Sequence, residues 1–225
     1  MKSKRNSTAC LRLLYGTIAG LLIGISALAI YLVQDRLREA KAVDTGHFSV
    51  EGEARFDGAI RIEPPIGVPD FTLTKQDGKK TSLRDLRGQF VLLTFGFTNC
   101  PDICPLTLSD FQGIEELLGE SAERLAFVFV SVDGSRDSPS VLRSYFEFRG
   151  LDGIIALSGD EDTVREIGAP FGLAFEVIGE AATGIYSVNH TAGSFLLDPR
   201  GRWIMRFQFG LPADRVAAEI RKLMS

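Results

Sequence analysis

Two cysteines separated by three residues, Cys100 and Cys104, are the part of this chain best suited to chemistry. They follow the apolar segment 89–97, where a strand is predicted to lead into a helix. On a helical turn, residues four apart share a face, with their Cα atoms roughly 6 Å apart. A metal chelate and a disulfide are both within reach, because bridged Cα atoms lie roughly 4.4 to 6.8 Å apart. The pair is a candidate site either for a soft or thiophilic ion, such as Cu(I) or Zn(II), or for redox chemistry.

The charges near the cysteines in the sequence favour a cation over a reactive thiolate. No Lys or Arg occurs between Arg87 and Arg124, while that stretch holds six acidic residues. Helix-end amides near Cys104 would stabilise a thiolate, but no basic side chain nearby in sequence adds to that effect. Except for Asp102, the acidic residues are equally explained as a solvated helix face. A purely structural disulfide is disfavoured, because it would close a tiny loop and constrain little chain entropy.

Helical and extended patterns alternate along the chain after the cysteines. Helical patterns cover 106–118, 139–149, 160–167 and 212–224. Extended patterns cover 71–74, 80–83, 89–97, 125–132, 194–197 and 203–209. The continuous apolar run 125–132 is typical of a buried parallel strand, whereas 194–197 and 203–209 flank a turn and are predicted to be antiparallel neighbours. This order predicts an α/β domain with a mixed sheet and helices on both faces.

A third metal donor would have to come from one of two histidines, His47 and His190. His190 stands just before the predicted strand 194–197, whereas His47 lies in a charged stretch without periodicity. In a thioredoxin-like sheet, the strand order would bring the loop that carries His190 toward the N-terminus of the helix that follows the cysteines. His190 is therefore the predicted third ligand, and Asn189 is a candidate to orient its ring. The alternative is a structural histidine, the commoner role for a lone one.

The N-terminal part of the chain predicts a membrane anchor. Residues 13–33 carry no formal charge and are numerous enough to cross a bilayer at about 1.5 Å per residue. Four basic residues and no acidic one precede this segment, so 1–12 is predicted to be cytoplasmic and the rest translocated. The simplest interpretation is a bacterial inner-membrane protein with its globular domain in the periplasm, where disulfides persist. The alternative is a signal peptide cleaved after Ala27-Leu28-Ala29, although apolar residues continue to Val33.

Residues 34–63 are predicted to be a linker, and 64–225 to be the folded domain. The linker is charged, contains glycine and lacks sustained periodicity. Without the four basic residues of 1–12, the chain has 21 Lys and Arg (25 minus 4) against 29 acidic residues. A net charge of about −8 does not favour binding to the negatively charged phosphates of a nucleic-acid backbone, so nucleic acid is excluded as a partner.

Five stretches of the sequence together carry a specific family resemblance. They read GVPDF at 67–71, TFGFTNCPDICP at 94–105, SVDGSRDSP at 131–139, VNHT at 188–191 and DPRG at 198–201. The chain resembles the Sco/SenC family of copper-binding cytochrome c oxidase assembly proteins from about residue 67 to its C-terminus. The resemblance implies a thioredoxin-like domain tethered to the inner membrane, with a copper ion held by Cys100, Cys104 and His190.

The resemblance further implies a metallochaperone, rather than an enzyme, that delivers copper to the binuclear copper centre of an oxidase subunit. A periplasmic copper donor and a thiol reductant would be its other partners. Two departures stand out: Asn189 replaces the common aspartate before the histidine, and Thr191-Ala192-Gly193-Ser194 lacks the cis-proline of general thioredoxin-like oxidoreductases. Asp133 and Asp137 match a family loop and are interpreted either as a helix start or as a partner-docking element.

The rival hypothesis is a thiol-disulfide oxidoreductase that reduces the cysteines of the oxidase copper site. Such a reductase needs the thiols of Cys100 and Cys104 but no histidine donor. A metallochaperone should lose metal retention when His190 is replaced by alanine. His190 is therefore the residue that discriminates between the two functions.

Overall fold

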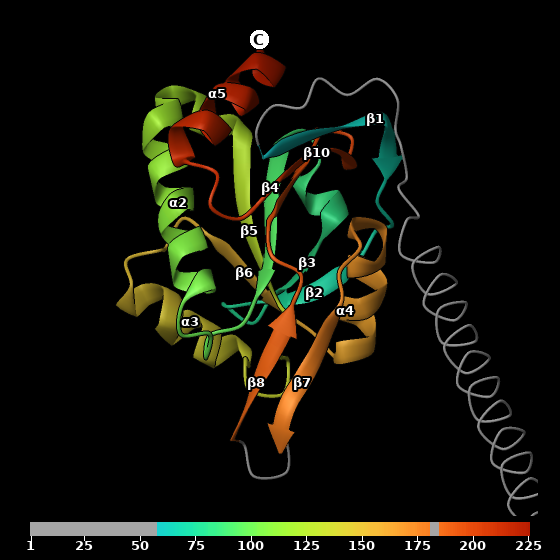
Figure 1. Ribbon diagram of the computed structural model, residues 1–225, viewed down its shortest axis with the longest axis vertical. Coiled ribbons are helices and arrows are strands. Elements are labelled where there is room, and N and C mark those ends of the chain that lie inside the picture. The colour runs from blue at the N-terminus through green and yellow to red at the C-terminus, as the bar shows by residue number, and fades with distance from the viewer. Residues whose placement is uncertain (1–57, 181–184) are drawn as a thin grey trace, which may run out of the picture. The chain divides into compact units, whose positions relative to one another are not determined.

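The computed structural model describes residues 58–180 and 185–225 of the chain (Figure 1). The predicted cytoplasmic N-terminus, membrane segment 13–33 and most of the predicted linker lie outside these described residues. Within the described residues, none of the helices combines the length and apolar character needed to cross a bilayer. The anchor therefore stays a prediction from the sequence.

The main sheet of the described part has eight strands in the order β1-β10-β9-β4-β5-β6-β2-β3. Their bounds are β1 Ala59–Gly67, β2 Thr72–Lys75, β3 Lys80–Ser82, β4 Phe90–Gly96, β5 Leu125–Ser131, β6 Ile155–Ser158, β9 Ser194–Leu197 and β10 Arg202–Phe207. Strands β4, β5 and β6 are parallel to one another, whereas β9 is antiparallel to both β4 and β10. The predicted mixed sheet, with a parallel centre and an antiparallel 194–207 pair, is confirmed.

Four α-helices of the described part cover the sheet. They are α2 Ile103–Leu118, α3 Pro139–Phe148, α4 Glu161–Gly168 and α5 Ala213–Met224, with short 3-10 helices at Leu83–Leu86 (η1), Gly119–Arg124 (η2) and Ala169–Phe171 (η3). Helices α2, α3 and α5 pack on one face of the sheet and α4 on the other (Figure 1). The α/β class with helices on both faces, in a thioredoxin-like arrangement, is therefore confirmed.

Strand β4 shows how the sequence divides the core between the two faces. All seven of its residues are buried, and side chains on a strand alternate between faces. Leu92 packs in the cluster with α2, α3 and α5, while Val91 and Leu93 pack in the cluster with α4. A strand buried on both faces reads as a continuous apolar run, which is why β4 and β5 could be predicted from the sequence.

The ends of several elements follow from local chemistry. Helix α2 stops at Gly119, whose φ of +56° favours glycine. The side chain of Ser138 caps α3 by accepting a hydrogen bond from the amide of Val141. Strand β1 begins at Ala59, within the range predicted as linker, and residues 59–61 pair with β10 in the sheet. The side chains of residues 60–63 alternate between less and more exposed, as expected of an edge strand. Pro64 and Pro65 follow directly, and because proline is uncommon in strands they argued against predicting one here.

A second, two-stranded sheet is formed by β7 (Phe175–Glu180) and β8 (Ile185–His190). The strands are antiparallel, with Phe175 opposite His190 at one end of the ladder. Figure 1 shows this hairpin extending from the end of the main sheet near the first turn of α2. The hairpin was not predicted from the sequence, which placed His190 in a loop; the structure places it at the end of a strand.

Candidate metal centre

The two cysteines lie at the start of α2, as the strand-to-helix pattern predicted. Cys104 is the second residue of the helix and is 4% exposed, while Cys100 is half-buried in the preceding loop. The cap of the helix is Asp102, so α2 begins three residues before the predicted helical pattern 106–118, and Pro105 is its third residue. Proline is tolerated there because the first backbone amides of a helix have no intrahelical acceptor.

The structure brings Cys104 and His190 together although 86 residues separate them in the sequence. The Sγ atom of Cys104 lies 3.8 Å from the Nε2 atom of His190. Both side chains, with Thr107 on the next turn of α2, line a small cavity of about 10 Å³. This space suits a single ion or water molecule, so the close pair has room for a metal but not for an organic substrate.

Cys100 supplies a second thiol near Cys104 from the neighbouring loop. Neither cysteine is bonded in a disulfide, and the Cys100 thiol is close enough to affect the ionisation of Cys104. In residues 58–180 and 185–225, however, no cluster of three or more His, Cys, Asp or Glu side chains is arranged to hold a metal ion. The described geometry therefore supplies one close S···N pair and a second thiol beside it.

The hydrogen bond on the far side of the His190 ring leaves its Nε2 atom available as a ligand. The Nδ1 atom lies 3.0 Å from the carbonyl oxygen of Thr191. Because a carbonyl only accepts, Nδ1 must carry the proton, and Nε2 keeps its lone pair directed toward Cys104. Burial lowers the pKa of His190, which favours this neutral form. Asn189, the predicted orienting residue, is exposed, and the backbone of Thr191 holds the ring instead.

Burial of the Cys104 thiol opposes its ionisation. Desolvation raises the pKa of Cys104 from 9.0 to about 12, with smaller contributions in the same direction from Cys100 and Asp137. A hydrogen bond with the backbone of Phe97 acts in the opposite direction without cancelling the rise. In the metal-free protein, burial therefore outweighs the backbone contribution that favours a thiolate at Cys104. A metal ion that binds here must displace the proton of Cys104.

Asp137 holds the loop that leads to the cysteines. Its side chain is fully buried and accepts hydrogen bonds from the amide of Thr98 at 3.0 Å, the hydroxyl of Thr98 at 2.5 Å and the hydroxyl of Ser131 at 2.6 Å. Burial raises the pKa of Asp137, although these hydrogen bonds act against the rise. Sequence analysis singled out Asp133 and Asp137 but left their role open. With Asp133 5% exposed and Asp137 0%, neither carboxylate lies on the exposed surface.

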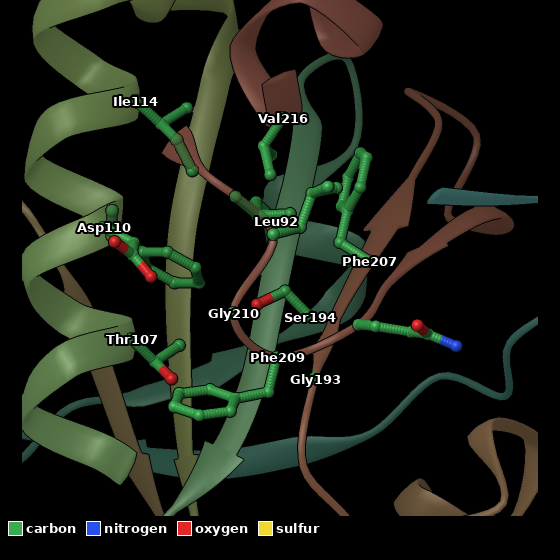
Figure 2. Close-up of a pocket in the computed structure, with 13 residues that line it drawn as sticks. Leu92, Thr107, Asp110, Ile114, Gly193, Ser194, Phe207, Phe209, Gly210 and Val216 are labelled. Atoms are coloured by element: carbon green, nitrogen blue, oxygen red, sulfur yellow. The ribbon is translucent and has the colours of Figure 1, made fainter. Parts of the chain in front are cut away.

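A neighbouring cavity lies farther along α2 and does not hold the predicted ligands. Figure 2 shows Thr107, Asp110 and Ile114 along one side of this cavity, with Leu92 of β4 to their right in this view. Its volume is about 20 Å³ and its walls are largely apolar. Burial raises the pKa of Asp110 at its edge. This cavity is too small for an organic substrate, so the chemistry of this region of α2 rests with the thiols and the imidazole.

Two residues that sequence analysis missed set the spacing of the site. Gly96, at the end of β4, allows Cys104 to approach the strand, and Phe97 packs edge-on against the His190 ring, with centroids 6.0 Å apart. Both belong to the segment 94–105 whose resemblance was noted, but no local pattern shows that a glycine faces a sulfur across the fold. Tyr186, on the same strand as His190, is a third residue near the site that the sequence did not point to.

These features define the class: a thioredoxin-like domain with a dithiol and an imidazole at a helix mouth. The SCO1/SenC family model matches residues 61–225, and the chain belongs to this family. SCO2-like protein RP587 of Rickettsia prowazekii is 30% identical over 200 residues, which cover 88% of this chain and 91% of that protein.

Solved structures of Sco proteins show the same fold. Bradyrhizobium japonicum ScoI with copper bound is 29% identical and covers 69% of this chain and 98% of its own, with a TM-score of 0.62. BsSco, a member of the Sco family of cytochrome c oxidase assembly proteins in which a disulfide switch was identified, is 25% identical. It covers 71% of this chain and 94% of its own, with a TM-score of 0.57. The predicted family is therefore confirmed.

Proposed function

We propose that this chain is a copper metallochaperone that holds a copper ion through Cys100, Cys104 and His190. It would deliver the ion to the binuclear copper centre of cytochrome c oxidase during assembly of the oxidase. Membership of the SCO1/SenC family supports this function, as does the copper bound to a relative of the same fold. Thiolate and imidazole are donors that suit copper in either oxidation state, so the chemistry of the three side chains fits the cargo.

The observation that carries the proposal is the 3.8 Å approach of Cys104 Sγ to His190 Nε2. Two features make this contact more than packing. The proton on Nδ1 is held by a carbonyl, as is usual for metal-binding histidines, and the lone pair of Nε2 faces sulfur. A structural histidine would use both ring nitrogens on fixed partners of the fold, whereas His190 faces a titratable thiol and a small cavity.

The second candidate function is reduction or exchange of disulfides, and the adjacency of the two thiols favours it. Cys100 contributes to the raised pKa of Cys104, so the sulfurs are near one another, and both are free. The buried, protonated Cys104 is a poor attacking nucleophile, because reactivity requires the thiolate. The half-buried Cys100 would therefore be the attacking thiol, and Cys104 the thiol that resolves the mixed disulfide.

An anaerobic copper titration of the reduced protein tests the proposed function. We expect one copper ion per chain, with sulfur and imidazole ligation seen by X-ray absorption and by electron paramagnetic resonance of Cu(II). The His190→Ala variant should bind copper at least of the order of tenfold more weakly, by analogy with the losses that follow when ligand support is removed. His47→Ala is the matched control and should bind as the parent does.

Three results would contradict the proposal in different ways. If the number of copper ions bound per chain is unchanged after both cysteines are replaced by serine, copper is bound elsewhere and the proposed site is ruled out. Parental affinity in His190→Ala, with copper loading of the oxidase retained in cells, would make His190 structural and favour the reductase. Parental affinity with lost oxidase activity would keep the chaperone function but withdraw His190 as a ligand.

The setting of the domain is part of the same proposal. The uncharged segment 13–33 and the basic residues before it support an inner-membrane anchor with the domain in the periplasm. There the domain would meet the copper-centre subunit of the oxidase, a copper donor and a thiol reductant. The net excess of acidic residues in the translocated part agrees with a cationic cargo and gives no support to a nucleic-acid partner.

A further inference from the structure

His190 lies on a hairpin that does not join the main sheet. Strands β7 and β8 pair with each other in a separate two-stranded sheet, which leaves the end of the domain beside α2 (Figure 1). An isolated two-stranded hairpin is only marginally stable in water. The position of His190 relative to Cys104 therefore depends on side-chain contacts between the hairpin and the rest of the domain.

Tyr186 makes such contacts from the same face of β8 as His190. The two residues are four apart on a strand, where side chains alternate between faces, and the residues between them alternate exposed, buried, exposed. The hydroxyl of Tyr186 donates to Asp133 Oδ1 at 2.7 Å. The backbone carbonyl of Tyr186 accepts from Arg136 Nη1 at 2.8 Å, and the Arg136 guanidinium lies 3.5 Å from the centre of the Tyr186 ring. One arginine thus holds both the backbone and the ring of β8.

The loop that carries Asp133 and Arg136 is itself firmly held. Arg136 Nε and Nη2 each lie 2.6 Å from Asp133 Oδ2, in an ion pair whose side chains are 19% and 3% exposed. The amides of Arg136 and Asp137 both donate to the carbonyl of Asp133. A Cβ atom on Gly134 would meet the carbonyl oxygen of Gly159 at 1.9 Å, so the loop packs directly on backbone. It can therefore act as a fixed reference for the hairpin.

The same loop also holds the segment that leads to the cysteines. Asp137 accepts two hydrogen bonds from Thr98, which stands two residues before Cys100. Residues 133–137 therefore contact both chain segments that carry the donor atoms: Asp137 contacts the cysteine loop, and Asp133 with Arg136 contacts β8. Tyr186 contacts both Asp133 and Arg136, and both hydrogen bonds are partly buried.

We propose that Asp133, Arg136 and Tyr186 are positioning residues that set where His190 lies relative to Cys104. This inference rests on the proposed function for its relevance to copper, but the position of the ring can be measured without metal. The three residues do not touch the ion; they act through β8. Loosening them should move the imidazole away from the sulfur while leaving the two thiols, which Asp137 and Thr98 hold, able to form their disulfide.

The first test replaces a single hydroxyl group in the full chain. Tyr186→Phe removes the hydrogen bond to Asp133 but keeps the ring beside Arg136 and the backbone carbonyl. The matched control is Tyr145→Phe, because the hydroxyl of Tyr145 is buried without a hydrogen-bond partner among the described residues. In the metal-free protein, the nuclear Overhauser contact between the rings of Phe97 and His190 should be present in the parent and the control. It should weaken in Tyr186→Phe.

Copper binding gives the second readout. Changes to groups that orient metal ligands typically cost 10- to 100-fold in affinity, and we expect a loss of roughly tenfold for Tyr186→Phe. Nitrogen hyperfine coupling on bound Cu(II) should weaken, while the sulfur ligation stays. Arg136→Lys should act in the same direction, because one ammonium group cannot replace the planar fork that reaches Asp133 and the Tyr186 carbonyl. Arg143→Lys on the exposed side of α3 is its control.

A third measurement separates positioning from general stability. Ile220 lies on α5 and is buried in the core on the face of the sheet opposite α4. Ile220→Val should lower the free energy of unfolding without a change at the site. An equal loss of copper affinity in Ile220→Val, at the same loss of stability, would overturn the inference. So would an unaltered Phe97–His190 contact in both Tyr186→Phe and Arg136→Lys. If the ring contact changes in these variants while copper affinity does not, the positioning role stands and the proposed ligand function of His190 fails.

Discussion

A Cβ atom on Gly96 would lie 2.9 Å from the Sγ atom of Cys104 and 2.7 Å from a ring carbon of Phe129. The end of β4 can therefore approach the first turn of α2 only because residue 96 has no side chain. Backbone conformation does not explain this glycine, because its φ lies outside the positive range. The requirement is space, and it connects the strand that organises the sheet to the buried thiol of the site.

We predict that Gly96→Ala displaces Cys104 and lowers the free energy of unfolding by about 1–3 kcal/mol, as overpacking of a core usually does. Copper affinity should fall because the sulfur moves relative to His190. Gly67→Ala is the control: a Cβ atom there meets nothing within 4 Å, so stability should change by less than about 0.5 kcal/mol. Urea unfolding and copper titration check both variants. Parental copper affinity in Gly96→Ala would show that the site tolerates the shift.

The second prediction concerns the carboxylate of Asp137. Asp137→Asn replaces an acceptor oxygen with a donor, so a buried hydroxyl of Thr98 or Ser131 must turn from donating to accepting, and the hydrogen bonds to the carboxylate are weakened. We expect a loss of about 1–3 kcal/mol in the free energy of unfolding. Thr98→Ser keeps both donors and should stay close to the parent. Urea unfolding of the metal-free, reduced protein measures the difference, and equal losses in the two variants would contradict the role assigned to these hydrogen bonds.

The third prediction follows from the raised pKa of Cys104. The folded protein keeps the Cys104 proton up to about pH 12, whereas the unfolded thiol loses it near 9.0. Between these values the unfolded chain binds fewer protons, so the free energy of unfolding falls as pH rises above 9. The contribution is fully present below that pH and is lost toward 12.

Cys104→Ser isolates this effect, because a serine hydroxyl does not titrate in the same range. Anaerobic urea unfolding of the metal-free protein at pH 8, 9 and 10 should give a smaller slope with pH for the variant than for the parent. Identical slopes would mean that the Cys104 thiol ionises in the folded protein as readily as in the unfolded chain.

The elements of the main sheet could be predicted because their residues carry local signals. The apolar run 125–132, the Ser138 cap and the stop at Gly119 all depend on residues close together in the chain. The β7–β8 hairpin lacks that advantage. Its strands mix exposed and buried residues on one face, and Val177 and Ile178 are both exposed, so the period-2 pattern is weak.

The proposed donor residues could be named from the sequence, but not their geometry or ionisation. Cys100, Cys104 and His190 followed from residue type, spacing and family resemblance. The 3.8 Å contact depends on how β8 packs against α2, which no local pattern encodes. The pKa of Cys104 depends on burial and not on helix-end amides alone, and burial at residue 104 comes from the close approach of β4.

The fourth prediction concerns the N-terminus, which lies outside the described residues. The uncharged run continues four residues past Ala29, so the segment 13–33 should be retained as an anchor. Membrane fractionation should find the mature protein in the inner-membrane fraction, and N-terminal sequencing should find it uncleaved. A mature N-terminus at Ile30 would show a signal peptide, and the domain would then be free in the periplasm.

The last prediction concerns copper and the disulfide, which should be mutually exclusive states of Cys100 and Cys104. The two sulfurs that would hold the metal as thiolates are the sulfurs that oxidation joins. In the copper-loaded protein, forming the bond removes two electrons from the two thiolates, so an oxidant such as excess oxidised glutathione must accept them and take two protons from solvent. We expect each disulfide formed in the copper-loaded protein to release one copper ion, measured with a chromogenic chelator against thiol counting.

His190→Ala should separate the metal from the redox chemistry of the same pair. The variant should form its disulfide with nearly the parental midpoint potential, because His190 is not a sulfur partner, while it retains copper more weakly. Because copper binds only the reduced pair, bound copper should also protect the parent from oxidation, and the degree of protection should follow the copper affinity. The variant binds copper more weakly and should be protected less, in the same proportion. Copper that stays bound after both thiols are lost to the disulfide would place the metal on other donors and contradict the shared site.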